Sequence, residues 1–117
     1  MAIQNADFVG ILDRRTLSTI ATVYTVPTGK TLANATLSIC NKSSSVTAYV
    51  DIYLCPSGGT AVDANLYYYQ FPVMSGNSTY GYVTATVTID HDLAAGDIIM
   101  VQSSSTVSLI TSGSLLS

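Results

Sequence analysis

Apolar and polar residues alternate with a period of two along most of this chain. Residues 46–54 read VTAYVDIYL and residues 83–89 read VTATVTI, so every second side chain in each run is apolar. A strand points successive side chains to opposite faces, and such runs are typical of antiparallel sheets with one buried face. No window of helical length keeps an apolar stripe at helical spacing. In the first run, the residues predicted to face the core are Val46, Ala48, Val50, Ile52 and Leu54, and those predicted to face the other way are Thr47, Tyr49, Asp51 and Tyr53.

Turn residues divide the chain into short segments. Gly, Pro, Asn and Ser cluster at residues 27–29, 43–45, 56–59 and 75–77, and residues 93–97 read LAAGD, where Gly96 is predicted to have a positive φ. Short strands at regular spacing predict an all-β fold, an antiparallel two-sheet β-sandwich of about eight strands that is jelly-roll-like. The predicted strands are residues 8–13, 18–26, 32–42, 46–55, 65–71, 78–90, 97–103 and 106–112.

Residues 1–17 precede the sandwich domain, which we place at residues 18–117. This segment combines apolar residues with both arginines of the chain. Two interpretations stay open: an edge strand of the sandwich, or an extended arm that adds a strand to a neighbouring subunit. The residues concerned are Phe8, Val9, Ile11, Leu12, Arg14 and Arg15.

The polar residues of this chain are mostly hydroxyls. Charged residues make up 9% of the sequence and apolar residues 48%, whereas Ser and Thr each occur 15 times. The net charge is −3, and Arg14-Arg15 is the only basic pair, so a nucleic-acid-binding surface is not expected. A weakly charged surface is compatible with assembly of many copies. The N-terminus has neither a signal-peptide pattern nor an apolar run of membrane-spanning length, so we expect a protein made in the cytoplasm with no membrane partner.

The two cysteines are predicted to be free thiols. If residues 32–42 and 46–55 form a hairpin, Cys40 lies opposite Ala48, and Cys55 lies opposite Ala33. The sulfur atoms would then be about 20 Å apart, at roughly 3.3 Å per residue, which is far beyond disulfide distance.

Candidate catalytic groups are sparse. His91 is the only histidine and lies between Asp90 and Asp92, but adjacent residues of a strand point to opposite faces and a polar turn is expected there. The sequence has no Gly-x-Ser-x-Gly elbow, phosphate loop, dinucleotide fingerprint or Cys-x-x-Cys motif. We therefore expect no enzyme activity, no cofactor, and no catalytic or metal-binding residues.

An aromatic cluster is the more informative feature. A hairpin turning at residues 75–77 would bring the aromatic residues on either side of it together across two strands. Core packing, a subunit interface and a platform for sugar rings are the three interpretations. Tyrosine is enriched at interfaces, and the sequence has no tryptophan, so the interface is favoured over the sugar platform as the functional interpretation. The residues of the cluster are Tyr67, Tyr68, Tyr69, Phe71, Tyr80 and Tyr82.

Four segments carry a resemblance to a known family. They read YTVPTGKT at residues 24–31, ICNKSSS at 39–45, PSGGT at 56–60 and LAAGD at 93–97. In this order and spacing, residues 18–112 resemble small β-sandwich virion structural proteins of tailed bacteriophages, found as free-standing proteins or within fibre-like chains.

The resemblance implies a place in the virion and no catalytic or ligand residues. The expected function is a capsid decoration or cement protein that binds and stabilises the head lattice as a homo-oligomer such as a trimer. Its partners would be itself and the major capsid protein or other virion proteins. The alternative is a tail, collar or fibre component that contacts host surface glycans. The candidate interface residues are Phe8, Ile11, Leu12, Arg14, Arg15, Tyr67, Tyr68, Tyr69, Tyr80 and Tyr82.

Overall fold

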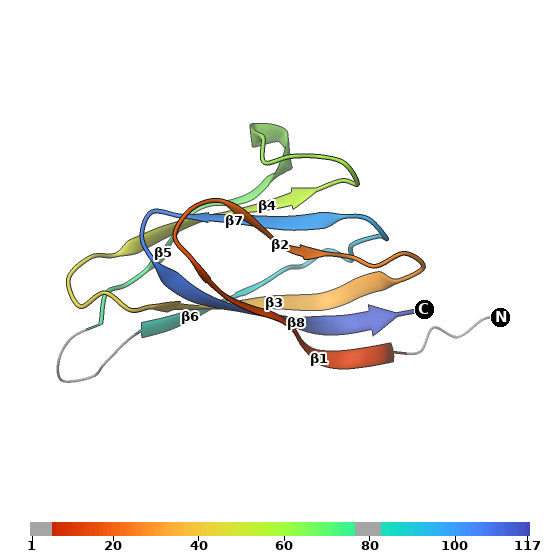
Figure 1. The fold of residues 1–117 in the computed structure, drawn as a ribbon, viewed down its shortest axis with the longest axis horizontal. Coiled ribbons are helices and arrows are strands. Elements are labelled where there is room, and N and C mark those ends of the chain that lie inside the picture. The colour runs from red at the N-terminus through yellow and green to blue at the C-terminus, as the bar shows by residue number, and fades with distance from the viewer. Residues whose placement is uncertain (1–5, 77–82) are drawn as a thin grey trace.

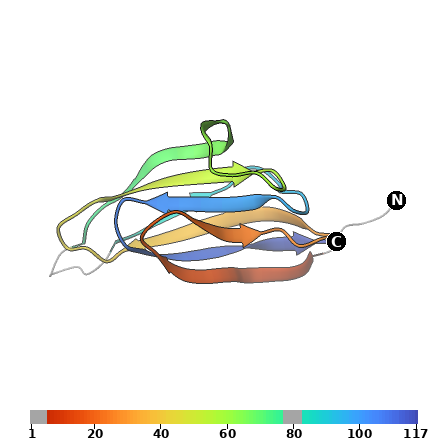
Figure 2. The same ribbon diagram turned by 45° about the horizontal axis from the view of Figure 1, so that its top comes forward.

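Eight strands form two antiparallel sheets in the computed structural model, which describes residues 6–76 and 83–117 (Figure 1). Sheet A has the strand order β1-β8-β3-β6, and sheet B has the order β2-β7-β4-β5. In Figure 2, β5, β4, β7 and β2 follow one another down the face of sheet B. A short 3-10 turn, η1 (Asp63–Asn65), precedes β5. The strands are β1 (Ala6–Leu17), β2 (Ala21–Thr25), β3 (Thr31–Asn41), β4 (Ala48–Cys55), β5 (Leu66–Val73), β6 (Val83–Thr88), β7 (Ile98–Ser103) and β8 (Val107–Leu116).

The strand order is that of a jelly roll. Each strand pairs with its counterpart counted from the other end of the chain: β1 with β8, β2 with β7, β3 with β6, and β4 with β5. The chain is therefore one long hairpin that rolls up, and rolling adds the pairs β3–β8 and β4–β7. The predicted all-β fold, an antiparallel two-sheet sandwich of about eight strands in jelly-roll order, is confirmed.

The core lies between the two sheets and follows the alternation of the sequence. In β4, Ala48, Val50 and Ile52 have no exposed surface, as predicted, but Val46 is 53% exposed because β4 begins only at Ala48. Burying a large aliphatic side chain contributes about 1.5–3 kcal/mol, so this layer supplies most of the stability. The largest buried side chains include Leu32, Leu37, Ile39, Ile52, Ile99 and Leu109.

Two predicted hairpins are wrong. Residues 32–42 and 46–55 do not pair, because β3 belongs to sheet A and β4 to sheet B. β5 and β6 likewise belong to different sheets, so the turn near residues 75–77 does not join paired strands. Except for β4 and β5, which pair within sheet B, consecutive strands of this fold cross from one sheet to the other. Cys40 and Cys55 are both free thiols, although the hairpin used to predict this does not form.

Asn41 links the two sheets through hydrogen bonds. Its side chain is fully buried, and Nδ2 donates to the carbonyls of Val46 (2.8 Å) and Val73 (3.0 Å). Its Oδ1 accepts from the backbone N–H of Ser43 at 2.9 Å. Asn41 therefore holds the end of β3, the crossing loop and the end of β5 in one arrangement.

The turn at residues 93–97 closes the other end of the sandwich. Gly96 has φ +87, which confirms the predicted positive φ. Gly96 N–H donates to the carbonyl of Val26, and Val26 N–H donates to the carbonyl of Asp97, each at 2.9 Å. Within the described ranges, no helix is long and apolar enough to cross a membrane.

Candidate interaction surfaces

The N-terminal segment forms an edge of sheet A. β1 pairs with β8 from Ala6 opposite Leu116 to Leu17 opposite Val107. Of the two interpretations of this segment, its described residues occupy the edge-strand position. The pairing is irregular between Ala6 and Phe8 and again between Ile11 and Asp13, so the edge is not flat.

The apolar side chains of β1 divide between core and solvent. Leu12 packs against the core. Phe8, Val9 and Ile11 are 45%, 68% and 42% exposed. The outer edge of sheet A therefore presents three apolar side chains to solvent.

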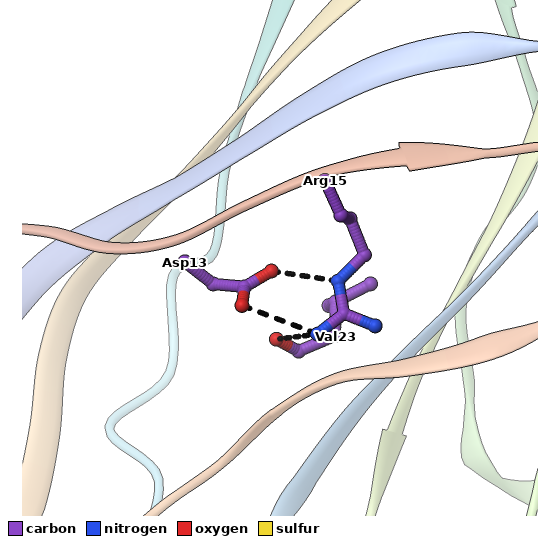
Figure 3. Close-up of polar contacts among 3 residues, drawn as sticks. All are labelled: Asp13, Arg15 and Val23. Carbon is purple, nitrogen blue, oxygen red and sulfur yellow. Dashed lines mark hydrogen bonds and ion pairs between the residues drawn. The ribbon is translucent and has the colours of Figure 1, made fainter.

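The two arginines of β1 differ in their contacts. Arg14 is exposed. Arg15 donates through Nε and Nη2 to the two carboxylate oxygens of Asp13, at 2.7 and 3.1 Å, and through Nη2 to the carbonyl of Val23 at 3.4 Å (Figure 3). The hydrogen bond with Asp13 raises the pKa of Arg15 above its ordinary value. Because Val23 lies in β2, Arg15 connects the edge of sheet A to sheet B.

The three consecutive tyrosines of β5 have three different environments. The hydroxyl of Tyr67 accepts from Asp90 N–H (3.2 Å) and donates to the carbonyl of Thr88 (3.3 Å). Tyr68 packs edge-on against Phe71, with ring centres 4.9 Å apart. Tyr69 is 64% exposed. The structure therefore does not gather these tyrosines into one patch, and the candidate residues Tyr80 and Tyr82 lie outside the described residues.

His91 packs against an aromatic ring on the surface. The residue is exposed, as are Asp90 and Asp92, and its ring lies edge-on to Tyr67 with centres 5.8 Å apart. Among residues 6–76 and 83–117, no three His, Cys, Asp or Glu side chains come together in a way that could hold a metal ion.

A polar hollow lies on the outer face of sheet B. Tyr49 and Asp51 point outward from β4, and Gln102 of β7 is the direct cross-strand partner of Asp51. Gln70 of β5 joins them from the other side. The hollow measures about 190 Å³ and is lined by Tyr49, Asp51, Gln70, Gln102, Ser103 and Ser104.

Local hydrogen bonds fix the walls of this hollow. Gln70 has φ +51, an unusual backbone conformation for a residue other than glycine, and lies where the pairing of β4 with β5 is irregular. Its N–H donates to Asp51 Oδ1 at 2.7 Å. On the opposite side, Ser104 Oγ accepts from Tyr49 N–H at 2.8 Å, and Ser104 N–H donates to the Tyr49 carbonyl at 3.0 Å. These hydrogen bonds therefore fix the backbone on both sides of the hollow.

The surroundings of the hollow are acidic and aromatic. Burial raises the pKa of Tyr53, and negative charge on Asp51, Asp63 and Tyr69 raises it further. Tyr53 therefore lies near Asp51, which lines the hollow, and near Asp63 and Tyr69.

Sequence reasoning identified part of this surface without recognising it as a site. The alternation in residues 46–54 predicted that Tyr49, Asp51 and Tyr53 share the outward side of their strand. Nothing in the sequence indicated that Gln102 would lie opposite Asp51, because this contact depends on β7 pairing with β4.

No protein-family model matches this chain, and no curated protein matches it in sequence. The function proposed below is therefore argued from the surfaces described above and from the resemblance of the turn segments.

Proposed function

We propose that this protein is a non-enzymatic structural component of a bacteriophage virion, bound to the capsid as a decoration or cement protein. The main support is the edge strand β1, on which Phe8, Val9 and Ile11 are exposed. The resemblance of residues 18–112 to small phage virion proteins supplies the setting.

An edge of this kind favours pairing with another chain. β1 has 12 residues, and among the described residues its only strand partner is β8, so its other side carries unpaired backbone groups. Folded proteins usually protect an edge with short strands, lysine, proline or bulges. β1 has bulges, and it carries charges at Asp7 and at residues 13–15, but residues 8–12 contain no charged residue and no proline. A partner strand would cover both the backbone groups and the apolar side chains of this stretch.

The low charge of the chain supports close packing of many copies. With 9% charged residues and a net charge of −3, neighbouring copies repel one another weakly. We propose a homo-oligomer such as a trimer that contacts the major capsid protein, since symmetric assemblies repeat one contact at every position.

A second candidate is a tail, collar or fibre component that contacts host surface glycans. The hollow on sheet B favours it, because Tyr49 provides a ring while Asp51 and two glutamines provide polar groups.

Mass spectrometry of purified virions tests the proposed place in the particle. Hundreds of copies per virion would support the capsid role, and a few dozen or fewer would support the tail or neck role. Absence of the protein from purified particles would contradict both.

A point substitution tests the role of β1. Deleting residues 2–15 would also remove Leu12 from the core, so it would confound assembly with folding. Val9→Lys places a charge on the most exposed apolar position of β1 and should reduce self-association at least about tenfold, since it forces a charge into the new contact. Light scattering would measure oligomer mass, and thermal unfolding should change little.

Ile20→Lys is the matched control, because Ile20 is 43% exposed but lies between β1 and β2. It should assemble like the wild type. Unchanged assembly and particle occupancy of Val9→Lys would show that β1 is not the contact.

A further inference from the structure

We propose that the hollow on the outer face of sheet B is a binding site for a neutral sugar residue of a glycan. The inference rests on the second candidate function above, for which it names the residues and the ligand class. It does not depend on whether β1 mediates assembly.

The lining offers both kinds of contact that a sugar ring requires. One side of a sugar ring carries C–H groups, which pack on an aromatic face, and Tyr49 is 48% exposed at the rim. Neighbouring sugar hydroxyls act as donor and acceptor together, so they pair with a carboxylate and an amide placed side by side. Asp51 and Gln102 are direct cross-strand partners, which puts their Cβ atoms about 5 Å apart.

Asp51 has hydrogen-bonding capacity beyond its structural role. Its Oδ1 accepts from the N–H of Gln70, whereas an ionised carboxylate offers about four lone-pair positions. The same bond holds Gln70 at the hollow in its positive-φ conformation. One lone-pair position of the Asp51 carboxylate therefore accepts from Gln70 N–H and shapes the hollow, and the other positions can accept from a ligand hydroxyl.

The charge of the hollow selects among ligand classes. Asp51 is its one ionisable acid, and among the described residues no lysine or arginine lines it. A phosphate, a sulfate or an acidic sugar would therefore meet a negative charge without a compensating cation. A neutral hexose meets none of this repulsion, and its hydroxyls suit the two glutamines and Ser104.

A second aromatic residue extends the site along β5. Tyr69 is 64% exposed and precedes Gln70 directly in sequence. It therefore offers a ring beside the hollow for the next sugar of a chain, so an oligosaccharide should bind more tightly than a single sugar.

Titration followed by ¹⁵N–¹H NMR tests this site on the intact protein. The probes are methyl α-D-glucopyranoside, methyl β-D-galactopyranoside and methyl α-D-mannopyranoside, with sodium glucuronate as the anionic probe. At least one neutral probe should shift the side-chain amide signals of Gln70 and Gln102, with a Kd of about 1–10 mM, as expected for a small open site. Glucuronate should bind more weakly than glucoside.

Substitutions separate the site from the rest of the surface. Tyr49→Ala and Asp51→Asn should each weaken binding of the responding sugar at least about tenfold. Asn at position 51 retains an oxygen that can accept from Gln70 N–H, so a wild-type spectrum elsewhere would show that the fold is kept. Tyr68→Ala and Asp92→Asn are the controls, since both residues are exposed and neither lines the hollow.

Two results would overturn the inference. One is that no neutral probe shifts the Gln70 and Gln102 signals, and the other is that the shifts persist unchanged in both Tyr49→Ala and Asp51→Asn. Neither result alters the virion copy number or the assembly of Val9→Lys, so failure of the sugar site is distinguishable from failure of the proposed function.

Discussion

At the scale of single residues, Asn41 is a buried polar group that constrains the fold. It is fully buried and makes three hydrogen bonds to backbone atoms of the crossing loop and of β5. A buried polar group without a partner costs about 1–3 kcal/mol, so the buried carbonyl of Val73 would carry this cost in the absence of Asn41.

We predict that Asn41→Ala lowers the free energy of unfolding by about 3 kcal/mol. The substitution leaves the carbonyl of Val73 buried without this donor and frees the loop at Val46. Urea unfolding followed by circular dichroism measures the loss. Asn65→Ala is the control, because Asn65 makes one exposed bond to Thr60, and its loss should stay below about 1 kcal/mol. Equal effects of the two substitutions would contradict the role of Asn41.

Two glycines with similar backbones differ in the space around them. Gly96 has φ +87 and Gly29 has φ +78, but an added Cβ would lie 2.7 Å from Ser57 Oγ at Gly96 and would meet nothing within 4 Å at Gly29. We predict that Gly29→Ala costs about 1 kcal/mol for the backbone alone. Gly96→Ala should cost about 1–2 kcal/mol more, and a thermal-melt comparison of the two variants isolates this steric part. The same melting temperature for both would contradict the crowding at Ser57.

At the scale of elements, two strands of the described ranges contain a residue other than glycine in the left-handed region. Asn34 of β3 and Gln70 of β5 have φ +55 and +51, and each lies where the strand pairing shifts register. Asparagine tolerates this region better than most side chains, whereas glutamine is strained in it by about 1 kcal/mol.

We predict that Gln70→Gly raises the free energy of unfolding by about 0.5–1 kcal/mol, because glycine adopts a positive φ without strain. Asn34→Gly should change it by less. Chemical denaturation of both variants measures the difference, and a destabilised Gln70→Gly would mean that the side chain itself contributes to packing.

The sequence predicted the positions of the strands better than it predicted which strands pair with one another. Period-two alternation identified eight strands and placed Val50 and Ile52 inside, because burial of one face is a local property of a strand. Which strands pair is decided by the roll of the whole chain, and a short turn such as residues 42–47 is compatible with either a hairpin or a crossing. For the same reason the sequence did not predict the hollow on sheet B, since Asp51 and Gln102 become cross-strand partners only when β7 lies beside β4.

At the scale of the whole molecule, three groups with raised pKa values make the free energy of unfolding fall at alkaline pH. Burial raises the pKa of the Cys55 thiol above its ordinary value of 9.0, and burial is also the largest cause of the raised pKa values of Tyr24 and Tyr53 above 10.0. A raised pKa in the folded state favours the protonated form there. The stability it contributes is present below the unfolded pKa and is lost as pH rises through the folded pKa.

We therefore predict that the free energy of unfolding falls as pH rises above about 9, and more steeply above about 10. Cys55→Ser should flatten the first part of this fall, because serine keeps a donor for the Thr60 carbonyl but does not ionise in this range. Urea titrations from pH 7 to 11 measure both slopes. A wild-type slope that Cys55→Ser leaves unchanged near pH 9 would show that the thiol is not responsible.

The pairing of the first strand with the eighth has a consequence for synthesis in the cell. Synthesis runs from the N-terminus, so β1 is made before the other seven strands, and its strand partner β8 is made after them. Until β8 has left the ribosome, sheet A lacks the strand that joins β1 to β3. Phe8, Val9 and Ile11 thus remain on an unpaired segment until the rest of the sandwich has been made, and chaperone binding to the nascent chain should concentrate there.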